Sequence, residues 1–70
     1  MTRYERQWQR YADAVAALGG SASSRQVAEY LGASYTTSNS WLIGAVNSGL
    51  LKRARISGAA YTYSTLDNPS

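Results

Sequence analysis

The sequence predicts a mainly α-helical domain that ends in a small β-hairpin. Three segments place apolar side chains three or four residues apart, which is the period of one face of a helix. Each segment begins after a Ser or Thr that can accept hydrogen bonds from the first helical amides, and each is followed by glycine. After Gly49 the period falls to two, which is typical of strands. The chain of 70 residues is therefore expected to form one domain, with three helices and then a hairpin.

The first helix is predicted over residues 3–18. Thr2 can cap it, and Glu5 three residues later completes a capping box. One stripe along this helix is apolar, and it consists of Tyr4, Trp8, Tyr11, Val15 and Leu18. We interpret the stripe as the side that packs into the core. The alternative interpretation, a seam between two copies of the chain, is compatible with the first.

Two further helices follow in close succession. Ser23 caps the second, predicted over residues 24–31, with Gln26 closing another capping box. Its buried face is expected to consist of Val27, Tyr30 and Leu31, and Gly32 ends it. Ser34 caps the third helix, predicted over residues 35–48. That helix is expected to turn Trp41, Leu42 and Ala45 inward, with Tyr35, Thr36, Asn39, Ser40 and Ile43 on its other sides.

The hairpin is predicted over residues 50–66, with Ser57-Gly58 as its turn. Alternation places Tyr61, Tyr63 and Thr65 on one face of the last strand. Exposed tyrosines can stack on unpaired bases, but this spacing better fits a hairpin that covers the helices. Residues 67–70 are expected to form a polar tail.

Composition narrows the possible functions. Seven Lys or Arg side chains against four Asp or Glu give a formal net charge of +3, and the chain has neither cysteine nor histidine. Little material is therefore available for acid–base or metal chemistry, and we expect no enzyme, metal, cofactor or small-molecule ligand. No apolar run approaches the roughly 18 residues of a membrane span. We expect a cytoplasmic protein that does not bind membranes.

The stretch SSRQVAEYLGASYTTSNSWLIGAVNSGLLKR, residues 23–53, resembles the helix-turn-helix and first wing strand of winged helix-turn-helix DNA-binding domains. A short capped helix ends in Leu-Gly, the next helix starts at Ser after one residue, and Gly-Leu-Leu precedes a basic strand. The matching positions are Ser23, Val27, Ala28, Leu31, Gly32, Ser34, Trp41, Leu42, Ala45, Gly49 and Leu50. Ala33 and Ser38 are smaller than is usual in the family, and we expect Trp41 to fill the space they leave.

This resemblance implies that residues 34–48 form a recognition helix in the DNA major groove. The candidate contacts on its outward face are Ser34, Tyr35, Thr36, Asn39 and Ser40. Asn39 is predicted to pair with adenine through both atoms of its amide. The alternative is an ordinary solvated helix face. Ser, Thr and Asn are poor helix formers, so their concentration at the start of this helix favours a functional face.

Cations complete the candidate interface. Lys52, Arg53 and Arg55 lie in the first strand of the hairpin, and Arg25 lies in the first turn of the second helix. We expect these four to contact phosphates. The alternative for the strand cations is protection of a sheet edge against aggregation. Three further arginines, Arg3, Arg6 and Arg10, are expected to form a solvated face unless the first helix also lies near DNA.

The sequence therefore predicts a small sequence-specific binder of double-stranded DNA. We expect it to regulate transcription, or to control excision or replication, in a viral or microbial genome. One such unit contacts few base pairs, so a homodimer on two half-sites is expected. The alternative is a winged-helix module that binds another protein and no DNA, which the absence of Arg and Lys from residues 34–48 favours.

Overall fold

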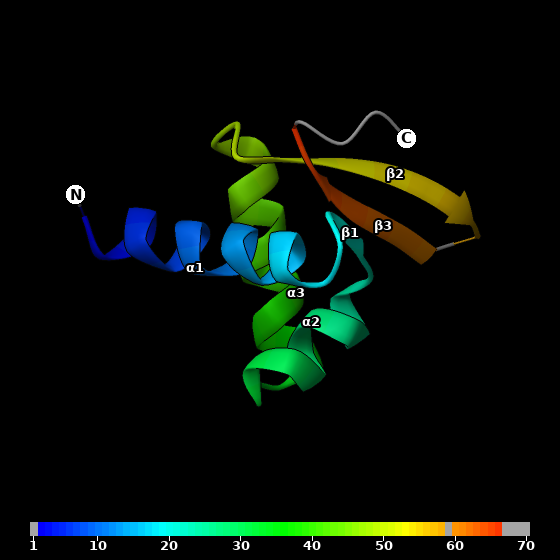
Figure 1. Ribbon diagram of the computed structural model, residues 1–70, viewed down its shortest axis with the longest axis horizontal. Helices are drawn as coiled ribbons and strands as arrows, with labels where there is room; N and C mark the ends of the chain where they lie inside the picture. The colour runs from blue at the N-terminus through cyan, green and yellow to red at the C-terminus, as the bar shows by residue number, and fades with distance from the viewer. Residues whose placement is uncertain (1, 59, 67–70) are drawn as a thin grey trace.

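A computed structural model describes residues 2–58 and 60–66 and confirms the predicted fold of three helices and a hairpin (Figure 1). The expected polar tail, residues 67–70, lies outside the described residues. The elements are α1 (Arg3–Ala17), β1 (Ser21–Ala22), α2 (Ser24–Leu31), α3 (Tyr35–Asn47), β2 (Leu51–Ser57) and β3 (Ala60–Thr65). Within the described residues, no helix is long and apolar enough to cross a membrane.

The predicted helix starts are confirmed by their hydrogen bonds. The Thr2 hydroxyl accepts from the Glu5 amide at 3.2 Å, while the Glu5 carboxylate accepts from the Thr2 amide at 3.0 Å. Ser23 and Gln26 form the same reciprocal pair at the start of α2. The Ser34 hydroxyl accepts from the Thr37 amide at 3.2 Å. Because these side chains satisfy amides that lack helical partners, they fix where each helix begins.

A three-stranded antiparallel sheet pairs the segment after α1 with the hairpin, in the strand order β1-β3-β2. The short strand β1 was not predicted, because two residues are too few for an alternating pattern to be recognised. It pairs Ser21 with Ser64 and Ala22 with Tyr63. In the hairpin, Arg53 lies opposite Tyr63 and Arg55 opposite Tyr61, and a bulge follows Arg55.

The core lies between the helices and one face of this sheet. Its largest fully buried side chains are Tyr11, Val15, Val27, Leu42 and Tyr63. The stripe of α1 is therefore a core face at Tyr11 and Val15. Trp8 and Leu18 pack against the edge of the core, whereas Tyr4 is 61% exposed. The predicted core position of Tyr63 is confirmed.

Besides Tyr4, two aromatic residues differ from the sequence-based expectation. Tyr30 is 55% exposed, so it does not belong to the buried face of α2, which is formed by Ser24, Val27 and Ala28. Trp41 is only partly buried at the rim of the core. The buried side chains of α3 are Ser38, Leu42 and Ala45, and the Trp41 ring lies 5.9 Å from that of Tyr4 on α1.

Candidate nucleic-acid interface

The orientation of α3 is determined by its buried side chains and by the turn that precedes it. Its buried side chains, Ser38, Leu42 and Ala45, lie against the core. A tight turn joins it to α2, and Gly32 in this turn adopts a left-handed conformation with φ +68°. Residues other than glycine rarely adopt this conformation. The turn therefore orients α3 so that the side opposite its buried residues faces outward.

The outward side of α3 carries a continuous stripe of four residues, Thr36, Ser40, Ile43 and Asn47. Their spacing of four, three and four residues keeps them on one face at 100° per residue. Thr36, Ser40 and Asn47 are exposed, and Ile43 is half-buried. At 1.5 Å per residue the stripe is about 16 Å long. It contains no charged side chain.

Two of these stripe positions, Thr36 and Ser40, were predicted from the sequence, but Asn47 was not. Asn47 is the last residue of the helix, whereas the contacts predicted for this helix all lie in its first two turns. The spacing from Ile43 is the signal that would have found it. The predicted contacts Ser34 and Tyr35 are both exposed at the start of α3, beside the stripe. The Ser34 hydroxyl donates to the Thr37 hydroxyl at 2.9 Å.

Asn39 does not lie on the stripe. It is half-buried and turned toward α2 and the sheet. Its side-chain oxygen accepts hydrogen bonds from the Ser24 hydroxyl at 3.0 Å and the Tyr63 hydroxyl at 3.3 Å. A carbonyl oxygen has two lone pairs, so both are engaged within the protein. Pairing with adenine through both amide atoms would require these internal bonds to break.

The strand cations project from the wing. Arg53 and Arg55 are exposed and alternate with Ala54, so they share one face of β2. Directly opposite residues of an antiparallel pair also share a face, which places Arg53 on the side of buried Tyr63. Both arginines therefore lie on the sheet face that looks toward the helices. Lys52 is half-buried on the other face.

The ring of Tyr61 supports the Arg53 side chain. The guanidinium carbon of Arg53 lies 4.4 Å from the centre of this ring. Such stacking leaves the N–H groups at the edge of the guanidinium plane available to an acceptor. Tyr61 is half-buried, so the sequence-based choice of packing over base stacking is consistent with its position beneath Arg53.

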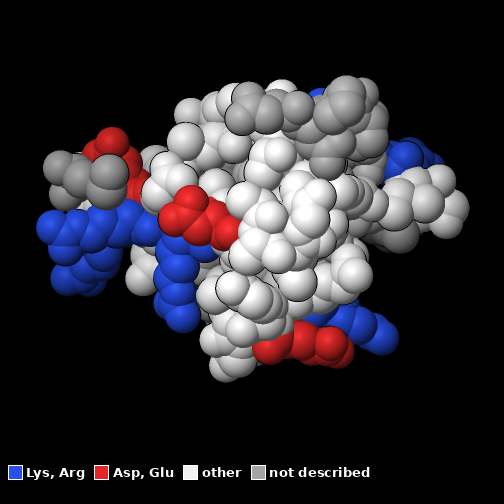
Figure 2. Space-filling model, in the orientation of Figure 1, with Lys and Arg blue, Asp and Glu red and all other residues white. Residues whose placement is uncertain are grey.

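Cationic side chains lie at the margins of the molecule. In the view of Figure 2 they gather over the N-terminal half of α1 at one end, near the hairpin tip at the other, and over α2 at the lower edge. Arg25 is exposed in the first turn of α2. Arg25 and Arg55 form no ion pair with any described residue. No group of three or more potential metal ligands occurs among residues 2–58 and 60–66.

Comparisons with known proteins identify no relative of this chain: no family model, curated protein or solved structure matches it. Its function is therefore inferred from the geometry above.

Proposed function

We propose that this protein binds double-stranded DNA in a sequence-specific manner and acts as a small cytoplasmic regulator of transcription, excision or replication. The observation that carries the proposal is the outward stripe of α3. It consists of short, neutral hydrogen-bonding side chains and one isoleucine, on a helix whose opposite side is anchored in the core. Such side chains suit the reading of base edges.

A helix of the diameter of α3 fits the DNA major groove. B-DNA has a major groove about 12 Å wide, which admits one α-helix. Thr36 and Ser40 lie near the N-terminal end of α3, and Asn47 lies at its C-terminal end. Thr36 can contact a thymine methyl group, and the amide of Asn47 can pair with adenine. In this proposal Asn39 holds α3 in position and makes no base contact.

Cations outside the stripe would supply most of the affinity. Arg53 and Arg55 on the wing, and Arg25 at the start of α2, would contact phosphates. Lys52 is half-buried and on the other sheet face, so we assign it a smaller part. The two kinds of contact can be measured separately. Phosphate contacts make binding sensitive to salt, whereas base contacts determine the sequence preference.

We further propose that two copies bind together on half-sites one helical turn apart. The support is an aromatic cluster where α1 packs on α3, in which Tyr4 is exposed and Trp8 and Trp41 are half-buried. Tyr4 is 61% exposed, and its ring lies 5.9 Å from that of Trp41 and 6.2 Å from that of Trp8. Light scattering after size exclusion should give twice the chain mass of 7.6 kDa. Tyr4→Ser should return the protein to the monomer mass, and a monomeric wild type would remove the dimer from the proposal.

The test of DNA binding combines selection and salt titration. A pool of random duplexes is selected on the protein, and fluorescence anisotropy then measures affinity for selected and unselected duplexes at two salt concentrations. Arg53→Gln with Arg55→Gln should weaken binding to both kinds of duplex and reduce the log–log salt slope by about 0.9 per lost contact. Thr36→Ala with Ser40→Ala should reduce only the preference for selected duplexes.

Two outcomes would count against the proposal in different ways. If the wild type binds no duplex in a salt-dependent manner, DNA binding is wrong and a protein partner for α3 takes its place. If duplexes are bound but the stripe variant keeps the full sequence preference, DNA binding stands and the assignment of the reading residues is wrong.

A further inference from the structure

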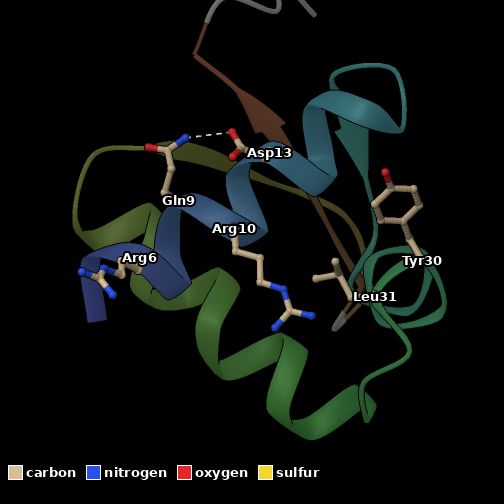
Figure 3. A pocket seen from close by; sticks show the side chains of 6 residues that line it. All are labelled: Arg6, Gln9, Arg10, Asp13, Tyr30 and Leu31. Carbon is tan, nitrogen blue, oxygen red and sulfur yellow. Dashed lines mark hydrogen bonds between the residues drawn. The ribbon is translucent and has the colours of Figure 1, made fainter. Parts of the chain in front are cut away.

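A groove between α1 and α2 lies outside the proposed DNA-binding surface. Its volume is about 470 Å³, within the usual range of binding clefts. Its lining consists of Arg6, Gln9, Arg10, Asp13, Tyr30 and Leu31, and we call it the α1–α2 groove. The first four come from α1 and the last two from the end of α2, so neither α3 nor the hairpin contributes (Figure 3).

One wall of this groove is cationic. Arg6 and Arg10 lie one helical turn apart on α1, and both are exposed. Neither forms an ion pair with any described residue. The one acidic side chain in the lining, Asp13, accepts a hydrogen bond from the Gln9 amide at 2.9 Å instead. In Figure 3 Arg10 extends toward Leu31, while Arg6 lies nearer the start of α1 and its side chain is directed away from Tyr30 and Leu31.

The other wall is apolar and partly exposed to solvent. Tyr30 is 55% exposed, and Leu31 is half-buried. The Tyr30 hydroxyl makes no hydrogen bond to a described residue. A large side chain on a helix as short as α2 would normally add to the small core of such a domain. Here Tyr30 instead forms the rim of the groove.

We propose that the α1–α2 groove binds an acidic segment of a partner protein. An apolar side chain of that segment would pack against Tyr30 and Leu31, and its carboxylates would pair with Arg6 and Arg10. Guanidinium groups match carboxylates well because they offer parallel N–H donors. The inference goes beyond DNA binding: it gives the protein a second surface, through which it would bring a partner to its DNA site.

An acidic peptide fits this groove better than a DNA backbone does. A phosphate chain presents evenly spaced charges and has no apolar side chain to place against Tyr30 and Leu31. The Asp13 carboxylate on the cationic wall would also repel a continuous row of phosphates. A peptide can place its carboxylates opposite Arg6 and Arg10 and leave a neutral residue beside Asp13.

Selection from displayed peptides tests the inference whatever the identity of the partner protein. Random 12-residue peptides displayed on phage are selected on the wild-type protein, and recovered sequences are synthesised with a fluorescent label. We expect recovered peptides in which Asp or Glu flanks Trp, Phe or Leu. Anisotropy should then show at least fivefold weaker binding to Arg6→Gln with Arg10→Gln, and weaker binding to Tyr30→Ala.

The matched control is Arg53→Gln with Arg55→Gln, which removes the same amount of charge from the wing. This control should keep its affinity for the peptides. The inference is overturned if no peptide is recovered, if the recovered peptides are not acidic, or if both double variants weaken peptide binding equally. Circular dichroism and the thermal midpoint establish that each variant is folded before binding is compared.

A DNA arm separates this inference from the proposed function. An unselected duplex should bind the Arg6→Gln, Arg10→Gln variant as it binds the wild type. If that variant loses duplex binding as strongly as the wing variant does, the two arginines belong to a DNA-binding surface and the inference is wrong. If the wild type binds peptides but no duplex, the proposed function fails while the α1–α2 groove assignment stands.

Discussion

The indole ring of Trp8 lies against the backbone of α3 at Gly44. A Cβ atom at position 44 would come within 2.9 Å of Trp8 Cδ1, and closer still to its Nε1 atom. Real side chains essentially never approach so closely. Glycine inside a helix normally costs about 1 kcal/mol relative to alanine. Its presence at position 44 is explained by the close approach of α1 to α3.

Gly44→Ala should therefore destabilise the domain, although alanine is the better helix former. Overpacking costs about 1–3 kcal/mol, against a propensity gain of about 1 kcal/mol, so the net loss of stability is expected to reach about 2 kcal/mol. In a Trp8→Ala background the obstruction is gone, and the same substitution should become neutral or stabilising. Urea unfolding of the four proteins in this double-mutant cycle measures the coupling. Equal effects in both backgrounds would mean that the ring moves aside without cost.

Ser38 is expected to be a destabilising residue. Its side chain is fully buried, and its hydroxyl has no hydrogen-bond partner within the described structure. An unsatisfied buried hydroxyl costs about 1–3 kcal/mol. Ser38→Ala should therefore raise the free energy of unfolding by about 1 kcal/mol more than Ser40→Ala does. The exposed Ser40 lies on the same helix, so the control removes the common gain in helix propensity.

Chemical denaturation of the two serine variants provides the measurement. An equal increase in the free energy of unfolding in both variants would show that the buried Ser38 hydroxyl does not destabilise the wild type. A loss in Ser38→Ala alone would show that the hydroxyl is bonded in solution and stabilises α3.

The sequence was sufficient for those features that depend on short-range chemistry. The capping pairs at Thr2, Ser23 and Ser34 were predictable because each interaction spans only three residues. The glycine after α2 was predictable for the same reason. Together with the change of period after Gly49, these signals predicted the order of the three helices and the hairpin, with bounds within one residue of those observed, but they did not predict β1.

Features that depend on how two elements cross were not predictable. Periodicity places Tyr4 and Tyr11 on one stripe of α1, but only the crossing with α3 decides which of them is covered. Likewise, Asn39 and Ser40 are neighbours with similar polarity. The position of Tyr63 on β3, 24 residues further along the chain, is what turns Asn39 inward. Gly44 gave no signal at all, because its partner Trp8 lies on another helix.

The start of α1 should respond to acid through Glu5. The backbone hydrogen bond from Thr2, and then the Thr2 side chain, lower the pKa of this carboxyl below its ordinary value of 4.5. A lowered pKa in the folded state means that the charged form stabilises folding at pH values above 4.5. That contribution is lost as the pH falls through the folded-state pKa, when the carboxylate becomes protonated.

Glu5→Gln provides the matched control for this titration. Gln is uncharged but can accept the same hydrogen bond, as Gln26 does at the start of α2. The stability advantage of the wild type over Glu5→Gln should therefore shrink between pH 6 and pH 3. Thermal unfolding of both proteins across this range measures the difference. An advantage that stays constant would show that the capping box does not involve the ionised carboxylate.

Asn39→Ala should destabilise the domain by about 1–3 kcal/mol, because it removes the acceptor of two buried hydroxyl groups. Tyr63→Phe removes one of those hydroxyls. It should cost up to about 1.5 kcal/mol in the wild type, yet be neutral or stabilising in the Asn39→Ala background. Additive effects in urea unfolding would mean that Tyr63 and Asn39 do not interact.

Asn47→Ala is the matched control on the same helix, and it distinguishes an asparagine that positions α3 from one that reads DNA. Asn47 is exposed at the end of the outward stripe, so its loss should change stability by less than about 0.5 kcal/mol. If α3 lies in the major groove as proposed, Asn47→Ala should reduce the preference for selected over unselected duplexes. Asn39→Ala, measured at a temperature where it remains folded, should weaken binding to selected and unselected duplexes alike. A displaced α3 would lose base contacts and phosphate contacts together. The reverse result, with sequence preference lost at Asn39 and kept at Asn47, would show that the internal bonds of Asn39 open on DNA and that this residue reads the base.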